Sequence, residues 1–313
     1  MKIVIIGAGV AGLSLGWRLA QAGAEVTILE RGQPGSGATN ASAGMIAVTA
    51  ELLDAHAVEI EFSRHSNALW PEFAEAVEAG SDRMIGYSRS GALLVASDAA
   101  ALGRLARRGG EAGLEMLDAG QARARAPLVT GPLAGALWSP KEAKVDARAL
   151  SAALTLAFQR AGGRLLANEA VVRIERRGGR AAIAHTPFGL YHADVFVLAA
   201  GAWSGLIEAG LAPITPVKGE MIALAPPKGE KKAIGKLLGP VIWGNGVYAV
   251  PRGNNLLIGA TVENAGFDTA LTDAARDGLR ATWAYRALVA RNLVLQFLEE
   301  APSRSDASKE VLA

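Results

Sequence analysis

The sequence of 313 residues contains no cysteine. This absence excludes disulfide bonds, thiolate metal sites and cofactors linked through sulfur, and it suits a protein of the reducing cytoplasm. Long apolar runs are lacking too, since none reaches the roughly 18 residues that a membrane-spanning helix needs. The apolar start, residues 3–17, is broken by glycines and has no clear small-residue cleavage site after it, so we do not interpret it as a signal peptide. We therefore expect a cytoplasmic protein without a membrane span.

The sequence also has little net charge, because 32 Lys and Arg residues are nearly balanced by 30 Asp and Glu residues. No dense basic face with interleaved aromatic residues occurs, so we expect no nucleic-acid partner. We predict no metal site, because no cysteine or acidic cluster accompanies a histidine at the spacing of metal ligands. The histidines are interpreted as surface or structural residues; they are His56, His65, His185 and His192.

Glycine, in contrast, is abundant, with 37 residues against a usual share of about 7%. The most informative glycines follow a short β-rich run, Ile3 to Ile6, in the spacing G-x-G-x-x-G at residues 7–12. A helical repeat comes next, and residues 25–29 form a second strand that ends at Glu30. This order is typical of a dinucleotide-binding unit.

Each part of this unit has a physical task. Gly7 permits a tight turn, Gly9 lets a pyrophosphate approach the backbone, and Gly12 lets the helix pack closely on the strand. The phosphates then lie at the positive N-terminus of the helix. Glu30 can accept hydrogen bonds from the adenosine ribose, and its charge disfavours NADP. FAD and NAD both stay open on this motif alone.

The segment at residues 35–45, GSGATNASAGM, has no charge and no large branched side chain. It comes shortly after Glu30, so it starts near the adenosine end of the expected cofactor. Small side chains leave backbone N–H groups free to contact phosphate and ring oxygens. We interpret the segment as a cofactor-binding stretch of backbone and not as a linker.

These motifs together resemble the D-amino-acid-oxidase-like family of FAD-dependent oxidoreductases, and 43–45 (Ala-Gly-Met) is most similar to its glycine oxidase branch. Further matches follow in the family's order and extend the resemblance over residues 1–268. They are 145–150 (VDARAL), 197–204 (VLAAGAWS), 216–220 (PVKGE), 248–252 (YAVPR) and 259–263 (GATVE).

The resemblance implies FAD as the cofactor and assigns its contacts to residues from five parts of the chain. These are Gly7, Gly9, Val10, Ala11, Gly12, Glu30, Arg31, Ala38, Thr39, Ala43, Gly44, Met45, Val171, Ala200 and Gly201. It also places Tyr248 in the substrate cavity, where its hydroxyl would position an amino-acid carboxylate. The implied reaction is oxidation of glycine or a similar small amine to an imine and then a keto acid, in thiamine (thiazole) biosynthesis. Oxygen, giving hydrogen peroxide, or a quinone would accept the electrons.

The implied fold is an α/β protein in which a Rossmann-like FAD-binding domain is interleaved with an antiparallel-sheet (α+β) substrate domain. We assign residues 1–80 and 145–213 to the first domain, and residues 81–144 and 214–268 to the second. In the FAD-binding domain, residues 194–198 are expected to form a buried strand. In the substrate domain, we expect strand-like runs in 84–96 around a turn at Ser90-Gly91, and in 237–263 around turns at 244–246 and 253–255.

The remaining residues depart from the family. Residues 269–301 are expected to form a C-terminal helical segment, with a long amphipathic helix from Asp273, and residues 302–313 a frayed tail. Family members continue with an Arg-Pro segment, whose arginine binds the substrate carboxylate, and a Gly-His segment that closes over the flavin. This sequence has no Arg-Pro pair and no histidine after His192.

Several interpretations therefore stay open. The protein is an active oxidase with a substitute arginine, a flavin-binding homologue that is catalytically impaired or truncated, or a D-amino acid dehydrogenase that passes electrons to a quinone. A further interpretation, which rests on the glycine motif at residues 7–12 alone, is an NAD-dependent dehydrogenase. A homo-oligomer is also left open.

Overall fold

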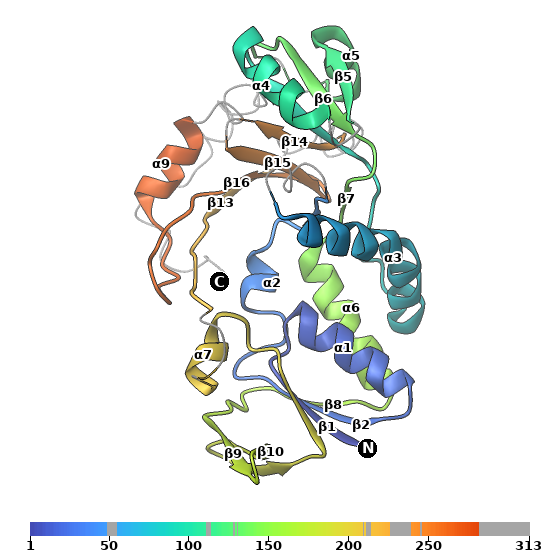
Figure 1. Ribbon diagram of the computed structural model, residues 1–313, viewed down its shortest axis with the longest axis vertical. Coiled ribbons are helices and arrows are strands. Elements are labelled where there is room, and N and C mark those ends of the chain that lie inside the picture. The colour runs from blue at the N-terminus through green and yellow to red at the C-terminus, as the bar shows by residue number, and fades with distance from the viewer. Residues whose placement is uncertain are drawn as a thin grey trace.

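The computed structural model describes residues 1–48, 55–110, 114–127, 129, 131–208, 210, 214–225, 239–244 and 246–281. Two sheets organise these residues, a parallel sheet near one end of the molecule and a seven-stranded sheet near the other (Figure 1). The parallel sheet uses strands from residues 2–29 and 164–198, and the larger sheet uses strands from 92–139 and 221–259. The expected mixed α/β architecture, with a Rossmann-like parallel sheet and an antiparallel sheet built from alternating stretches of the chain, is confirmed.

The parallel sheet contains the two strands expected near the N-terminus. In order across the sheet its members are β12 (Val195–Leu198), β1 (Lys2–Ile6), β2 (Glu25–Leu29) and β8 (Arg164–Leu166). Ile3 to Ile6 are all buried, as the unbroken apolar run predicted. The strand expected at 194–198 is present as β12, but the expectation that it is buried is wrong. Within the described part of the chain β12 lies at the edge of the sheet, and Val195 is 40% exposed.

Three helices pack together beside this sheet (Figure 1). They are α1 (Val10–Gln21), α3 (Ala57–Ser81) and α6 (Ala147–Arg160). Leu13 and Trp17 of α1 are buried in the same core as Ile3, Ile5 and Phe158, which confirms the helical repeat after the glycine motif. Among the described residues, no helix is both long and apolar enough to cross a bilayer.

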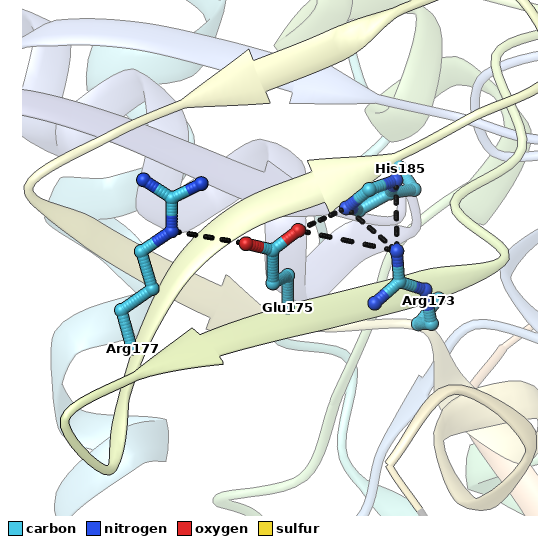
Figure 2. Close-up of polar contacts among 4 residues, drawn as sticks. All are labelled: Arg173, Glu175, Arg177 and His185. Atoms are coloured by element: carbon cyan, nitrogen blue, oxygen red, sulfur yellow. Dashed lines mark hydrogen bonds and ion pairs between the residues drawn. The ribbon is translucent and has the colours of Figure 1, made fainter.

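A small antiparallel sheet packs against the parallel sheet through a second core. Its strands are β9 (Arg173–Arg177), β10 (Arg180–His185) and β11 (Leu190–His192). Figure 2 shows the polar cluster on its surface, in which the Glu175 carboxylate contacts Arg177 Nε at 2.9 Å and His185 Nε2 at 2.9 Å. The hydrogen bond from His185, and then that from Arg177, lowers the pKa of Glu175. His185 thus has a structural role on this sheet.

The seven-stranded sheet is antiparallel except where β14 runs parallel to β4. Its order is β13 (Met221–Leu224), β16 (Asn255–Gly259), β15 (Val247–Arg252), β14 (Val241–Gly244), β4 (Ala92–Ala96), β6 (Gly135–Ser139) and β5 (Glu115–Asp118). As expected of strands joined by tight turns, β14, β15 and β16 are antiparallel neighbours, and 253–254 form a turn between β15 and β16. The expected turn at 244–246 includes residue 245, which lies outside the described residues. Helices α4 (Ala99–Gly110) and α5 (Ala119–Arg125) contact the end of the sheet that contains β5 and β6.

The expected strand-like runs on both sides of Ser90-Gly91 are only half correct. Residues 92–96 form β4, whereas residues 84–90 contribute one isolated bridge, from Ser88 to Lys144. Ile85 is buried in the core around α1 and α6, and its carbonyl accepts a hydrogen bond from the Asp146 N–H at 3.0 Å. This stretch therefore connects the two sheets instead of extending one of them.

Short elements complete the fold where the two sheets approach each other. They are α2 (Ala38–Ala41), β3 (Met45–Ile46), β7 (Ala143–Lys144), the 3₁₀ turn η1 (Gly201–Trp203), α7 (Ser204–Ile207) and α9 (Asp273–Ala281). The helix expected from Asp273 is present as α9 up to Ala281. Its expected continuation to residue 301 and the tail at 302–313 lie outside the described residues.

Candidate cofactor and substrate site

The glycine motif forms a tight turn between β1 and α1. Gly7 has a φ of +107°, and a Cβ on it would lie 2.4 Å from the Ala199 carbonyl oxygen. A Cβ on Gly12 would lie 2.0 Å from the Gly7 carbonyl oxygen. The tight turn and the close packing expected of these two glycines are both present. They also bring the end of β1 against the backbone of 199–200, the segment that follows β12.

The N-terminus of α1 is accessible. Its N-cap is Gly9, which has no side chain, and Val10 and Ala11 are exposed. The Val10 N–H donates a hydrogen bond to Thr39 Oγ1 at 3.0 Å, so the segment after β2 is attached to the first turn of the helix. Exposed N–H groups at the positive end of a helix suit a phosphate group.

Glu30 lies beside this turn. Its carboxylate accepts hydrogen bonds from the Ala8 N–H at 2.7 Å and the Gly32 N–H at 2.9 Å. Each carboxylate oxygen has a second lone pair, so the group can still accept hydrogen bonds from a ribose. The structure thus brings together Glu30 and the glycine motif, and it gives Glu30 a second role in holding the turn.

The small residues of 35–45 have two different causes. A Cβ on Gly35 would lie 2.5 Å from Ser151 Oγ, and one on Gly44 would lie 1.9 Å from the Val145 carbonyl oxygen. At Gly37 the nearest atom, on Trp203, is 3.9 Å away. Two of the three glycines are therefore needed for packing against α6 and the residue before its N-cap, a cause that the sequence interpretation did not foresee.

The far end of this segment reaches the larger sheet. Ala43 and Met45 pack in one apolar cluster with Met221 and Tyr248. The Tyr248 hydroxyl donates a hydrogen bond to Met221 Sδ at 3.3 Å and lies over Gly259, where a Cβ would be 2.9 Å from the hydroxyl oxygen. The predicted ring-contacting residues and the predicted substrate-contacting tyrosine are thus neighbours.

The other predicted contacts occupy different surroundings. Val171 is buried and Ala200 half-buried in the core between the parallel and the three-stranded sheets, so their accessible groups are mainly backbone. Gly201 is exposed with a φ of +54°. Arg31 is exposed, and its guanidinium carbon lies 3.6 Å from the centroid of the Trp203 ring. Trp203 was not among the predicted site residues, although it lies within the VLAAGAWS segment that carried the resemblance.

The arrangement fits a dinucleotide whose second half is an aromatic ring system. The open first turn of α1 suits the pyrophosphate, the Glu30 carboxylate suits the ribose, and 35–45 leads from there to Tyr248. The fold and the site define a dinucleotide-binding protein of the Rossmann-like class. Residues 2–293 match the family model DAO, described as FAD dependent oxidoreductase. The chain belongs to this family, and its cofactor is FAD and not NAD.

The chain is similar to several glycine oxidases. It is 33% identical over 276 residues to glycine oxidase of Geobacillus kaustophilus, which covers 85% of this chain and 71% of that protein. Identity to glycine oxidase of Pseudomonas aeruginosa is 31%, covering 90% of this chain and 77% of that protein. The chain also matches the bifunctional protein ThiO/ThiG of Trichormus variabilis with 32% identity, over 85% of this chain and 40% of that longer protein.

Solved structures agree with this assignment. The crystal structure of the Geobacillus kaustophilus glycine oxidase superimposes with a TM-score of 0.81 at 31% identity, covering 91% of this chain and 78% of that one. An L-α-glycerophosphate oxidase from Mycoplasma pneumoniae with FAD bound shares the fold with a TM-score of 0.74 at 20% identity, covering 93% of this chain and 80% of that one.

Proposed function

We propose that the protein oxidises glycine or a similarly small amine or amino acid. The substrate would lose two electrons and two protons at its carbon–nitrogen bond, and water would hydrolyse the resulting imine to a keto acid and an amine or ammonia. Oxygen would take up the electrons and protons to give hydrogen peroxide. FAD, when bound, supplies the two-electron acceptance that this reaction needs.

The observation that carries the proposal is that Tyr248 and the end of 35–45 belong to one apolar cluster. Tyr248 shares an apolar cluster with Ala43 and Met45, which lie in the cofactor-binding segment. The Tyr248 side chain is half-buried, and its hydroxyl donates to Met221 Sδ, a weak acceptor that a substrate carboxylate would replace. Apolar neighbours on both sides favour a small substrate, because Met45 and Met221 leave little polar surface to hold a larger polar side chain. In this proposal Tyr248 orients the substrate, and Met45 and Met221 shape the site.

The reaction is tested with purified protein loaded with FAD. We expect flavin absorption, and peroxide release with glycine, sarcosine or a small D-amino acid. Oxygen consumption measured against reduction of a quinone analogue distinguishes the two electron acceptors. A protein that binds FAD but turns over none of these substrates with either acceptor contradicts the proposed reaction.

Tyr248→Phe tests the assignment of the hydroxyl. Because one hydrogen bond to a charged substrate group is lost, we expect the apparent KM to rise by roughly tenfold. Tyr87→Phe is the matched control, since it removes a buried hydroxyl that has no hydrogen-bond partner among the described residues. Equal kinetics for Tyr248→Phe and the unaltered protein would remove Tyr248 from the site.

We further propose that the reaction takes place in the cytoplasm as a step of thiamine (thiazole) biosynthesis. The similarity to the bifunctional protein ThiO/ThiG supports this placement. Rescue of thiamine-independent growth in a strain that lacks its own glycine oxidase is the test, and failure of the FAD-loaded, active protein to rescue growth argues against it.

A further inference from the structure

The indole of Trp203 contacts residues from two other stretches of the chain. Arg31 follows β2, and its guanidinium carbon lies 3.6 Å from the centroid of the Trp203 ring. Phe267, in the loop after β16, stacks on the indole with centroids 5.3 Å apart and an interplanar angle of 30°. The end of the cofactor-binding strand, the segment after β12 and a loop from the larger sheet thus meet at one ring.

The position of Trp203 relates it to the FAD site. It ends η1, which begins directly after Ala200, and the backbone of 199–200 is the surface against which Gly7 packs. Arg31 is adjacent to Glu30, whose carboxylate is bonded to the glycine turn. A long arginine side chain at an exposed position has many rotamers, and stacking on an indole restricts them while keeping the charge accessible. The stack therefore holds a positive charge next to Glu30, at the part of the site that suits the adenosine ribose.

The loop that carries Phe267 is held at a second point. The Lys218 ammonium donates a hydrogen bond to the Ala270 carbonyl, and the backbones of Lys218 and Glu263 form an isolated bridge. Phe267 lies between these two attachments, so its contact with Trp203 determines how the middle of the loop lies against the FAD-binding part of the molecule.

We propose that Trp203 is a positioning residue for the FAD site, which holds Arg31 next to Glu30 at the adenosine end of the cofactor and links that site to the loop at 264–270. The link is physical: FAD contacts that order Arg31 also order the indole on which Phe267 rests. This inference depends on FAD being the cofactor, but it is independent of which substrate is oxidised.

Binding of FAD to the apoprotein, followed by quenching of flavin fluorescence, is the first test. Trp203→Leu removes the stack and is expected to raise the Kd for FAD about fivefold to thirtyfold, whereas Trp203→Phe retains a ring and is expected to stay within about threefold. Arg31→Met should show a similar loss, and the double variant should be no worse than the more severe single one. Trp138→Leu is the control, because it removes another tryptophan that faces an arginine, Arg125 at 5.2 Å, in the larger sheet.

Hydrogen exchange of the backbone amides tests the link to the loop. We expect FAD to slow exchange in 264–270 of the unaltered protein, and to have no such effect in Trp203→Leu under conditions that saturate it with FAD. Should Trp203→Leu fail to fold, the same comparison is made between Arg31→Met and the unaltered protein. The proposal is overturned by strictly additive losses of FAD affinity for Arg31→Met and Trp203→Leu. It is also overturned if FAD does not change the exchange rate in 264–270 of the unaltered protein.

Discussion

The backbone N–H of Ala8 donates a 2.7 Å hydrogen bond to the carboxylate of Glu30, and this bond ties the glycine turn to the end of β2. Ala8 and Glu30 are 22 residues apart in the sequence, yet both are at the carboxyl ends of neighbouring parallel strands. Glu30 is therefore a part of the fold before any ribose is bound. Its replacement is expected to affect the apoprotein as well as cofactor affinity.

Glu30→Gln separates these two roles. The amide keeps the shape of the side chain but has one accepting oxygen in place of two, so one backbone N–H at the turn loses a charge-assisted acceptor. We expect the free energy of unfolding of the apoprotein to fall by about 1 to 3 kcal/mol, and the Kd for FAD to rise at least tenfold. Urea unfolding without FAD and an FAD titration measure the two effects.

Glu25→Gln at the start of β2 is the control for that substitution. Glu25 forms only an exposed ion pair with Lys2 at 3.6 Å, and its loss is expected to change neither quantity appreciably. If the Glu30→Gln apoprotein is as stable as the unaltered apoprotein, the hydrogen bond to Ala8 contributes nothing to the stability of the turn.

Gly44→Ala tests the packing of the segment at 35–45. Gly44 has a φ of +81°, and an added Cβ would lie 1.9 Å from the Val145 carbonyl oxygen, so the backbone of one of the two segments has to move. We expect the unfolding free energy to drop by roughly 3 kcal/mol or more. Gly37→Ala, in the same segment but with its nearest atom 3.9 Å away, is expected to change stability by less than about 1 kcal/mol. Similar unfolding curves for the two variants would contradict this account.

These glycines also show what the sequence can and cannot predict. The order of strand, glycine motif, helix and strand at residues 2–29 was predictable because each element has a local periodicity and a local stop signal. The small residues at 35–45 indicated close approach of the backbone, but whether a cofactor or the Val145 carbonyl approaches depends on where residue 145 lies in space. The same holds for Trp203 and Phe267, which stack although 64 residues separate them.

Residues 84–90 show a case in which the local sequence predicted the wrong element. Their apolar residues suggested a strand, yet Ile85 is not part of one and is buried in the core between the parallel sheet and its helices. Local propensity could not show this, because the decision depends on which core the residue meets in three dimensions.

The ion pair between Lys218 and Glu220 gives a prediction about α9. The two side chains are buried and their charged atoms are 2.9 Å apart, while the Glu220 carboxylate also accepts hydrogen bonds from the N–H of Thr272 at 3.0 Å and from its hydroxyl at 3.2 Å. Burial alone would raise the pKa of Glu220, but the hydrogen bonds from Thr272 and Lys218 outweigh it and lower the pKa. The stabilising effect of the carboxylate is therefore present above its ordinary pKa and is lost as the pH falls through the lowered value.

Glu220→Ala should consequently lower the melting temperature by several degrees at neutral pH. The substitution leaves the buried Lys218 ammonium without its carboxylate partner and Thr272, the residue before α9, without the acceptor of two hydrogen bonds. The difference from the unaltered protein should shrink in acid, once the carboxylate is protonated. Glu115→Gln, which breaks an exposed pair with Arg125 at 3.4 Å, is the control and should have almost no effect. Equal melting temperatures of Glu220→Ala and the unaltered protein at neutral pH would contradict the role of this ion pair.

Lys144 gives a prediction in the alkaline range. Burial lowers the pKa of its ammonium from 10.5 to about 8, although the group donates a hydrogen bond to the Gly239 carbonyl at 3.2 Å. Below pH 8 the lysine is charged in both the folded and the unfolded chain, so the folded state carries the cost of burying a charge. Between pH 8 and pH 10.5 only the unfolded chain keeps the proton, and that cost disappears as the pH rises.

Lys144→Met removes this group while keeping a side chain of similar length. At pH 7 we expect it to be more stable than the unaltered protein, by at most about 3 kcal/mol, and this advantage should vanish by about pH 10. Lys2→Met, at an exposed lysine, should show no such pH-dependent difference. Chemical unfolding of the three proteins between pH 6 and about pH 10 checks the sign, since a buried cation that destabilises the fold requires the two stability curves to converge as the pH rises. Curves for Lys144→Met and the unaltered protein that stay parallel over that range would show that Lys144 is solvated well enough in the folded chain to titrate as it does in the unfolded one.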